Sequence, residues 1–596
     1  MNTSPAQATR PTDPGTGITH LSRWGAAQVR TLLRPLALVG TSVVAVVLLA
    51  GSLPWLTGSD PARTVLRARQ VERDADPAAL AAIRADLDLP SSPLVGALRW
   101  SSRAAGGDLG VSWVSGRAVA DTLGSALAVS LNLAGFAALT SLVVAVLLVA
   151  PRVIGAGLGR PATSTRLRAL AAILAAAPGF VVAVLLVSVF AVQLGWLPSS
   201  GWREPRDMIL PVTALSLGAT GVLIRILMSA VTAVADEDWV HTWRANGARP
   251  TRIARSIARR AIAVALPQVM LIFAGIVGAA VIVEEVYAIP GLGRVTLEAS
   301  LAQDLPVVQG AVAALVVLGT TVGLLGAALH RTLMSPALTD GHGSTPTRRE
   351  GRFTPSPPWL ISAITLTALI VGGLFRTVEI HPDQRHLAPS LLHPLGTDHV
   401  GRDVWGRVGQ GALLTIGPAI LVSLICLVIG LTVGLVATHA SAGITDVLNA
   451  IPSVFLGLVV AAVLGPGLLS ASLAICLVGW IPLAVHTRTL AAEARATGFH
   501  QAALVAGATR GRIMIRHLLP GVIRPVTGHA VVRLARLALA LTGLGFLGLG
   551  AGHDSAEWGK LLADSVVHLE RAPWAMAAPA VGLVLLGLVA NLAGED

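Results

Sequence analysis

Long runs of apolar residues alternate with shorter polar segments along the whole chain. Because a bilayer core about 30 Å thick requires roughly 20 apolar residues per helix, these runs predict twelve membrane-spanning helices. The predicted fold class is therefore all-α, a polytopic membrane protein. The predicted spans lie near residues 33–53, 123–150, 169–194, 208–234, 264–284, 307–330, 358–377, 411–437, 445–464, 467–487, 523–548 and 574–593.

The first apolar run needs its own interpretation because Arg23, Arg30 and Arg34 precede it, as basic residues precede the apolar part of a signal peptide. No small-residue cleavage site there is followed by a recognisable mature domain. We therefore expect this run to be retained as a span. The polar segment that follows, about 54–121, is expected to be an ordered segment outside the cytoplasm.

A polar segment at residues 335–358 divides the chain. It is rich in Pro, Gly, Ser and Thr and has no helical period, so it predicts a cytosolic linker. The first half, 1–334, has six spans and a basic loop at 235–262, and the second half, 359–596, has six spans and a corresponding loop at 488–520. A duplicated six-helix plan is typical of transporters built from two pseudo-equivalent halves around one pathway.

Composition supports the membrane interpretation and narrows the chemistry. Hydrophobic residues make up 54% of the 596 residues and charged residues 13%, against about 25% charged in soluble domains. The two cysteines, both in apolar runs, exclude a disulfide scaffold and a cysteine-based metal centre. The sequence has no GxxxxGK[ST] loop, so it lacks this phosphate-binding loop for ATP.

The net charge of +12 has several candidate explanations: nucleic acid, anionic lipid, or anchoring of cytosolic loops. Its distribution favours the last, because 24 of the 44 basic residues lie in segments that share one side of the predicted topology. Cytosolic loops of membrane proteins carry this excess of arginine and lysine, so we predict no nucleic-acid partner. These segments are 1–34, 151–168, 235–262, 331–357 and 488–524.

The fifth interhelical loop of each half carries the most specific pattern. Each contains a short helical stretch that ends at a glycine, Gly247 or Gly507, and an arginine-rich stretch then leads into the next apolar run through Leu266-Pro267 or Leu519-Pro520. A glycine just after a helix is a common helix stop, so each loop predicts a rigid surface handle suited to a groove in another protein. The alternative is a basic loop anchored to anionic lipid.

Further motifs accompany these loops in both halves. The second loop, Gln501–Gly507, is close to Glu-Ala-Ala-x-x-x-Gly with Leu-Pro twelve residues after the glycine. With these motifs the chain resembles the ABC-importer permeases of the dipeptide, oligopeptide and nickel group, as a fusion of the two permease subunits. The other matching stretches are Asp60–Arg63, Gly107–Gly110, Asp238–Gly247, Val283–Gly293, His393–Asp403, Gly543–Gly550 and Glu557–Gly559.

The resemblance implies a function in which this chain is not an enzyme. Two cytosolic ATP-binding cassette subunits, or one fused pair, would bind ATP and Mg, and an extracytoplasmic binding protein would deliver a peptide or related small solute. The protein would lie in the bacterial plasma membrane with both termini cytoplasmic, and the chain itself would bind no cofactor. The resemblance implies ATPase contacts at Trp239, His241, Trp243, Arg244, Gly247, Gln501, Ala502, Ala503 and Gly507.

Two features depart from the family pattern. Gln501 stands where the signature has glutamate, which replaces a charge-assisted hydrogen bond with a neutral one of about half the strength. Coupling through the second loop is therefore expected to be weaker. In the first half, Leu266 follows Gly247 by nineteen residues, later than the family spacing, so the geometry of the following helix is less well defined.

Charged residues inside the predicted spans are candidate pathway residues, because a charge at the bilayer centre is costly and usually functional. Arg533 and Arg536 are three apart and share one helical face. Either they line the pathway and attract a carboxylate, or they extend to the inner surface or pair with an acid. Glu284 and Glu285, near the outer end of a span, are candidates for that acid or for the outer mouth.

Other function classes fit less well. A self-contained secondary transporter of six plus six helices predicts titratable acids within the spans, and apart from Glu284 and Glu285 we find none. A membrane enzyme would need clustered polar catalytic residues, which the sequence lacks. Imidazole suits nickel, but six histidines on the outer side show no ligand spacing, so we predict no metal site. These are His381, His386, His393, His399, His553 and His568.

Overall fold

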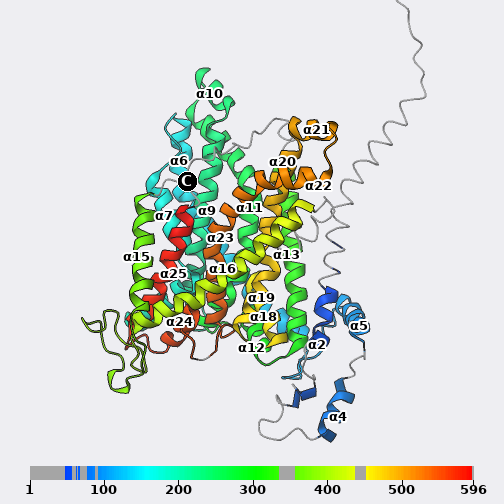
Figure 1. Cartoon of the computed structure of the whole chain (residues 1–596), viewed down its shortest axis with the longest axis vertical. Helices are drawn as coiled ribbons and strands as arrows, with labels where there is room; N and C mark the ends of the chain where they lie inside the picture. Colours follow the sequence, from blue (N-terminus) through cyan, green and yellow to red (C-terminus); the bar gives the residue numbers. More distant parts are fainter. Residues whose placement is uncertain are drawn as a thin grey trace, which may run out of the picture.

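The computed structural model is a bundle of long helices (Figure 1). Among the residues it describes, regular structure outside helices is limited to two isolated bridges, Val111 with Ala118 and Thr397 with Asp403. Most of the first predicted span, most of the linker at 335–358, and 437–451 lie outside the described residues. The structure describes residues 40, 44, 47–56, 62, 63, 65, 66, 77–87, 92–333, 356–436, 452–552 and 554–593.

The predicted spans are confirmed for most of the described chain. Nine helical stretches are long and apolar enough to cross a membrane, and a bent pair brings the number to as many as ten. The stretches are Val119–Gly157 (α6), Pro205–Ala235 (ending in α9, Ile209–Ala235), Pro250–Val286 (α11), Leu305–Val322 (in α13, Leu305–Leu333), Pro357–Leu374 (α15), Val404–Val436 (α16), Leu468–Arg495 (α19, Leu468–Gly479, with α20, Ile481–Arg495), Gly511–Phe546 (ending in α23, Leu519–Phe546) and Pro573–Ala590 (in α25, Pro573–Ala593).

Two predicted spans differ from simple crossings. The span near 169–194 is broken by 85° between α7 (Thr165–Ala176) and the helix that starts with α8 (Gly179–Leu186). The break falls at Ala177, whose backbone is extended because the next residue is proline. The described part of the span near 445–464 is α18 (Ser453–Leu464), twelve residues that end at Gly465, too short to cross a bilayer alone.

Each half is held together by its own long helices. In the first half, α6, α9 and α11 pack against one another and α7 lies against α9. In the second half, α16 packs against α15, α20 and α23, and α25 lies against α15 and α23. This repetition follows from the sequence, because both halves distribute long apolar helices in the same order.

The halves meet along two seams. On one side α18 packs against α11, α13 and the short helix α12 (Leu292–Leu301), and on the other α25 packs against α7. Glycine permits the close approach at both: a Cβ on Gly278 would lie 2.3 Å from Pro452, and one on Gly587 would lie 3.0 Å from the Ala176 carbonyl oxygen. Side chains larger than hydrogen at these positions would force the halves apart.

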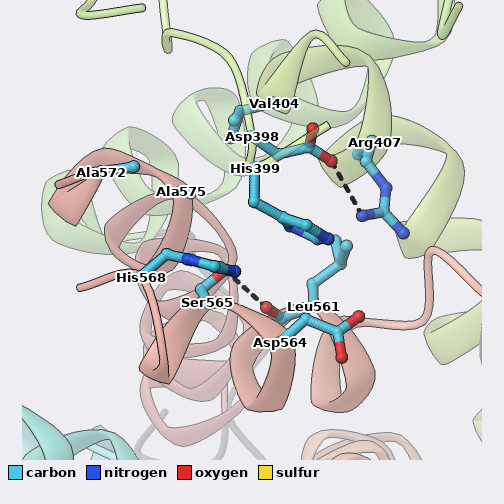
Figure 2. A pocket seen from close by; sticks show the side chains of 10 residues that line it. All are labelled: Asp398, His399, Val404, Arg407, Leu561, Asp564, Ser565, His568, Ala572 and Ala575. Atoms are coloured by element: carbon cyan, nitrogen blue, oxygen red, sulfur yellow. Dashed lines mark hydrogen bonds and ion pairs between the residues drawn. The ribbon is translucent and has the colours of Figure 1, made fainter. Parts of the chain in front are cut away.

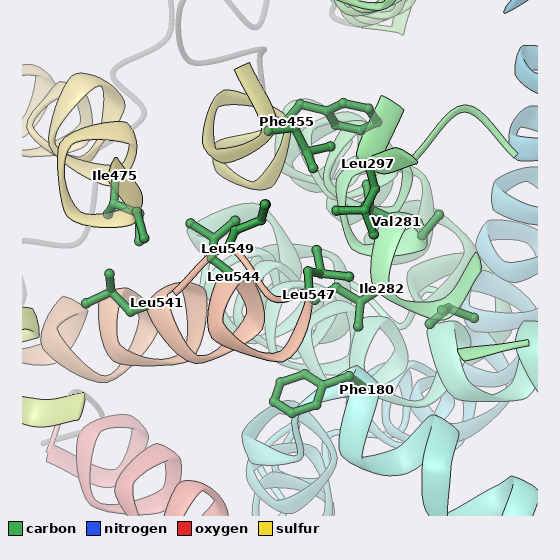
Figure 3. Close-up of a cluster of buried hydrophobic side chains, with 14 of the residues drawn as sticks. Phe180, Val281, Ile282, Leu297, Phe455, Ile475, Leu541, Leu544, Leu547 and Leu549 are labelled. Atoms are coloured by element: carbon green, nitrogen blue, oxygen red, sulfur yellow. The ribbon is translucent and has the colours of Figure 1, made fainter. Parts of the chain in front are cut away.

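One continuous hydrophobic core spans both halves near the end of the bundle where α11 and α23 finish (Figure 3). The rings of Phe180 in α8 and Phe546 in α23 are 5.2 Å apart. Ile282 in α11 lies so close to Gly543 in α23 that an added Cβ would be 3.0 Å from its Cδ1 atom. Residues 541–545 of α23 are all buried. We call this cross-half contact the seal.

The two ends of the bundle carry different elements (Figure 1). At one end lie the short helices α10 (Asp238–Ala245), α21 (Gly498–Val505) and α22 (Arg510–Ile513). At the opposite end lie α12, α24 (Trp558–Val566) and the loop that precedes α16. Three further helices of the described chain are α2 (Leu53–Leu56), α4 (Pro77–Leu87) and α5 (Pro93–Ala105).

Candidate functional site

The first basic loop folds as the sequence predicts, into a short helix closed by glycine. After α10, Gly247 adopts φ +71°, the left-handed conformation that glycine enters without steric cost. The Gly247 amide donates to the Arg244 carbonyl and the Ala248 amide to the Trp243 carbonyl, so the last carbonyls of α10 are satisfied. A proline at its first position, Pro250, then begins α11. The loop is therefore a defined surface element.

Side chains within this loop brace it against the long helices. Trp239 donates its indole N–H to Glu237 (2.7 Å), and its ring packs edge-on against Trp243 at 5.3 Å. Arg260 of α11 forms an ion pair with Glu237 (2.9 Å). Arg244 donates to the Ala156 carbonyl near the end of α6 (3.0 Å). Both tryptophan side chains are half-buried, and their contacts hold the loop in place.

Exposed groups on this loop are the ones free to meet a partner. His241 and Gly247 are exposed, and Arg244 keeps an exposed side chain despite its bond to α6. Sequence reasoning assigned partner contacts to Trp239 and Trp243 as well. That assignment stays a prediction, and the structure adds a structural role for both rings that the sequence pattern did not indicate.

The second loop repeats this architecture. Gly507 adopts φ +80°, its amide donates to the Leu504 carbonyl, and the Ala508 amide donates to the Ala503 carbonyl. Arg495 donates to the Leu435 carbonyl near the end of α16 (2.8 Å), the counterpart of the Arg244 bond to α6. A short π-helical turn, Met514–Leu518, leads into α23. In each half, therefore, an arginine in or just before the short loop helix bonds to an earlier long helix, Arg244 to α6 and Arg495, the last residue of α20, to α16.

The two loops present different chemistry. The surface of α21 is apolar: Phe499, Leu504 and Val505 are 62%, 47% and 91% exposed. Ala502 is exposed and Ala503 is half-buried. Gln501 lies in α21, but its side chain lies outside the described residues. The surface of α10 instead carries aromatic and charged side chains, so the two loops would favour different partner surfaces.

Glu284 and Glu285 do not pair with the arginines of α23, which corrects one alternative drawn from the sequence. Glu284 is 1% exposed and accepts hydrogen bonds from the Ser130 hydroxyl (2.5 Å) and from the amides of Gly293 (2.8 Å) and Arg294 (3.2 Å). Glu285 lies 3.7 Å from the Arg294 guanidinium. The turn between α11 and α12 brings these amides to the carboxylate, which sequence spacing alone does not reveal.

Arg533 and Arg536 lie on one face of α23, as their spacing predicts. The Arg536 side chain is exposed in the protein surface, and Arg533 is half-buried with its Nε atom buried and without a hydrogen-bond partner. Among the residues that the structure describes, no carboxylate lies within ion-pair distance of either guanidinium. Their role in a pathway stays a prediction at this point.

Comparison with known proteins identifies the chain. The family model for the binding-protein-dependent transport system inner membrane component matches it twice, over residues 152–335 and 419–595. The chain belongs to this family. Each match contains one of the two glycine-closed loops, so a single chain carries two permease units and is the permease component of a binding-protein-dependent ABC importer.

Relatives of the permease match between 40% and 52% of its length. It is 30% identical to the dipeptide transport system permease protein DppC of Alkalihalophilus pseudofirmus over 287 residues, 44% of this chain and 94% of that protein. It is 28% identical to the metal-staphylopine import system permease protein CntB of Staphylococcus aureus over 310 residues, 52% and 98%. A putative peptide transport system permease protein of Brucella abortus is 33% identical over 245 residues, 40% and 77%.

At the opposite end of the permease, the stretch His393–Asp403 folds into an ion-pair network. Asp398 lies 2.9 Å from Arg402 and 3.1 Å from Arg407, which is itself buried. Burial pushes the pKa of Asp398 upward, but amide hydrogen bonds from Arg402 and Val400 and the Arg402 charge outweigh it, so this pKa lies below its ordinary value. The network holds the start of α16 in place.

A small pocket adjoins this network and reaches α24 (Figure 2). The rings of His399 and His568 stack with centroids 4.8 Å apart, and His386 lies 5.2 Å from His568. Within the described residues, no group of three or more His, Cys, Asp or Glu side chains is placed to hold a metal ion. The sequence indicated the motif at 393–403 but not this grouping, because His568 is distant along the chain.

Proposed function

We propose that the α10 and α21 loops are the docking surfaces for two ATP-binding cassette subunits, or one fused pair. Those subunits would bind ATP and Mg and hydrolyse ATP, while this chain contributes no catalytic residue and binds no cofactor. The observation that carries the proposal is the repeated loop: each is exposed, closed by a left-handed glycine, and has an arginine in or just before its short helix that bonds to an earlier long helix, α6 or α16. A rigid tether of this kind transmits the movement of a docked partner to α6, α11, α16 and α23.

The charge distribution supports a cytosolic position for these loops. Segments 235–262 and 488–524 each contain six basic residues, as expected of loops on the positive, cytosolic side. This orientation puts both termini in the cytoplasm of a bacterial cell and the α12 and α24 end outside the plasma membrane. An extracytoplasmic binding protein would deliver the solute at that outer end.

The transported solute is a peptide or a related small solute in this proposal. Its support comes from the relatives, whose names refer to dipeptides, peptides and metal-staphylopine. The proposed mechanism is alternating access. Its support is the seal, an apolar contact between the halves near the proposed outer end, together with exposed polar residues of α23 nearer the loops, such as Arg524 and Thr527. ATP-driven approach of the two cassette subunits would move the loops together and open the seal.

Docking can be tested with a matched pair of valine variants. Val505 on α21 is 91% exposed and Val567, next to α24 at the opposite end, is 81% exposed. Because burying a valine contributes about 1.5–3 kcal/mol, Val505→Asp should weaken binding of the cassette subunits to the permease in nanodiscs at least tenfold, whereas Val567→Asp should leave it unchanged. Equal binding by the two variants would contradict docking at α21.

Transport in proteoliposomes distinguishes this proposal from the secondary transporter of six plus six helices. With cassette subunits and binding protein present, uptake of a peptide should require ATP inside the compartment that contains the cassettes. Uptake driven by a proton or sodium gradient without any cassette subunit would overturn the proposal. The structure gives the gradient-driven alternative no support, since the two acids near a span end are already engaged in local contacts.

A further inference from the structure

The helix α5, in the polar segment that follows the first predicted span, has an apolar outer surface. Leu94, Val95 and Leu98 are 65%, 53% and 52% exposed and share one face of the helix, since Leu98 follows the other two by four and three residues. We call these three residues the α5 apolar face. The preceding helix, α4, differs, because the exposed residues of its described part are alanines, Pro77 and Arg84. In Figure 1, α4 lies beyond the end of the bundle, whereas α5 lies beside the bundle.

The level of α5 relative to the membrane follows from the end of the first span. Pro54 has no amide hydrogen, so the Ala50 carbonyl lacks its usual helical donor. The buried side chain of Gln309 in α13 donates instead, with its Nε2 atom 3.0 Å from the Ala50 carbonyl oxygen and 3.2 Å from the Gly51 carbonyl oxygen. The sequence predicts that the first span ends near residue 53 and that the span in α13 begins near residue 307. These bonds therefore join the two spans where both reach the same membrane boundary.

The inner side of α5 packs on the membrane side of this boundary. A Cβ on Gly51 would lie 3.0 Å from the backbone of α5 and 3.2 Å from the ring of Trp100. Trp100 belongs to a buried apolar cluster with Ala50 and with Val312 and Val316 of α13. The two valines are five and nine residues beyond residue 307, about 8 and 14 Å along a helix. Since one leaflet contributes about 15 Å of the apolar core, the cluster and the helix packed on it lie at the depth of a single leaflet.

The sides of α5 match the three environments at that depth. Gly96, Trp100 and Ala104 are spaced by four residues and form the side that packs against the protein. The α5 apolar face lies beside this stripe, and Arg103 is exposed on the remaining side. Arginine can keep its stem in apolar surroundings while its charge reaches the lipid headgroups. With thirteen residues, α5 is too short to cross a bilayer, and helices with this division of apolar and basic sides bind at the membrane surface.

We infer that the α5 apolar face is embedded in the acyl chains of the bilayer, so that α5 anchors the described part of the polar segment 54–121 to the membrane surface. The occupant of the face is lipid because the face belongs to a helix packed at the depth of the spans, next to the exposed side of a basic residue. That the leaflet is the outer one rests on the proposed orientation of the permease, whereas the contact with acyl chains does not.

The test measures the surroundings of a nitroxide spin label on the full chain in nanodiscs of phosphatidylcholine, without cassette subunits. Both native cysteines are replaced by alanine, and the label is attached to Leu98→Cys. Collisions with oxygen, which dissolves in acyl chains, are compared with collisions with a water-soluble nickel chelate. The ratio at position 98 should be close to that of Ile364→Cys, an exposed position in the middle of the α15 span. It should be severalfold higher than that of Ala85→Cys, an exposed position on α4.

Two results would overturn the inference. A ratio at position 98 as low as that at position 85 would mean that the face is in water. Low collision rates with both reagents would mean that protein covers the face, either another part of this chain or a second copy.

Two further measurements guard against a variant that does not fold. A label on Leu94→Cys reports on the same face and should give the same ratio as position 98. A photoreactive benzophenone amino acid in place of Leu98, with both native cysteines retained, should form adducts of lipid mass on illumination, and the same amino acid in place of Ala85 should not. Adducts with a second permease chain, or equal lipid adducts at the two positions, would contradict the lipid contact.

Discussion

Replacing the glycine that closes α21 gives a quantitative test of the docking loop. Gly507 has φ +80°, and a Cβ built on it would meet no atom within 4 Å. Gly507→Ala therefore introduces no clash, and its cost is the left-handed backbone alone, about 1–2 kcal/mol. Since each 1.4 kcal/mol is tenfold in an equilibrium constant, the folded loop should become roughly 5- to 30-fold less favoured relative to its alternatives.

The assay is binding of the cassette subunits to the permease in nanodiscs, followed by stimulation of their ATP hydrolysis. Apparent affinity falls with the fraction of permease molecules whose loop has the binding-competent conformation, so Gly507→Ala should weaken binding of the cassette subunits by up to roughly 30-fold. Gly507→Asn should restore part of the lost affinity because asparagine tolerates left-handed backbone. Gly511, a helical glycine of α22 with equal free space, is the matched control. Its alanine variant should bind as well as wild type.

Two results would refute this reasoning. If Gly507→Ala and Gly511→Ala weaken binding equally, the left-handed backbone of the loop has no special role. If Gly507→Asn is no better than Gly507→Ala, the defect does not come from the backbone conformation. The same pair of substitutions at Gly247, which also has free space around it and φ +71°, should give a parallel result for the first loop.

Three further predictions concern the rest of the fold. Tyr287→Phe removes the hydroxyl that donates to the Ala183 carbonyl (3.0 Å) and should lower the free energy of unfolding by about 1 kcal/mol. Thermal unfolding in detergent measures this, and an unchanged stability would mean that the hydrogen bond contributes nothing. Trp558→Ala leaves a cavity at a fully buried site and should lower the free energy of unfolding by about 3–5 kcal/mol. The expected result is loss of folded protein in size-exclusion profiles, and a variant that unfolds at the wild-type temperature would contradict it. The pKa of Asp398 in the folded protein is lowered, so its contribution to stability is complete above its unfolded pKa of about 3.9 and is lost as pH falls through the folded-state pKa. Between pH 5 and pH 3, the melting temperature of Asp398→Asn should therefore fall less than that of the wild type. Parallel falls in the two melting temperatures would refute the role of this carboxylate.

The sequence allowed most of the architecture to be predicted, because hydrophobic runs of bilayer length are unambiguous signals. The two glycine-closed loops were also predictable, since a glycine after a short helix has a local physical cause. The crossing near 169–194 was predicted as a simple span, but Pro178 breaks it through the conformation of the residue before it. The span near 445–464 reaches only twelve residues in its described part.

Contacts that depend on tertiary folding were harder to predict from the sequence. Glu284 was a candidate partner for the arginines of α23, but it accepts hydrogen bonds from Ser130 and from two amides in the first turn of α12. Sequence spacing gives no sign that Ser130, far away on α6, reaches this carboxylate. Similarly, the ion pair of Arg260 with Glu237 and the stacking of His399 on His568 join residues that are distant along the chain.

The seal has a consequence for the leakage of protons through the permease. It consists of apolar side chains such as Phe180, Ile282 and Phe546, which offer water no hydrogen-bonding partner. Protons cross membranes readily along continuous chains of water molecules, and a dry constriction interrupts such a chain. A permease that rests with this constriction closed would not conduct protons from one side of its membrane to the other.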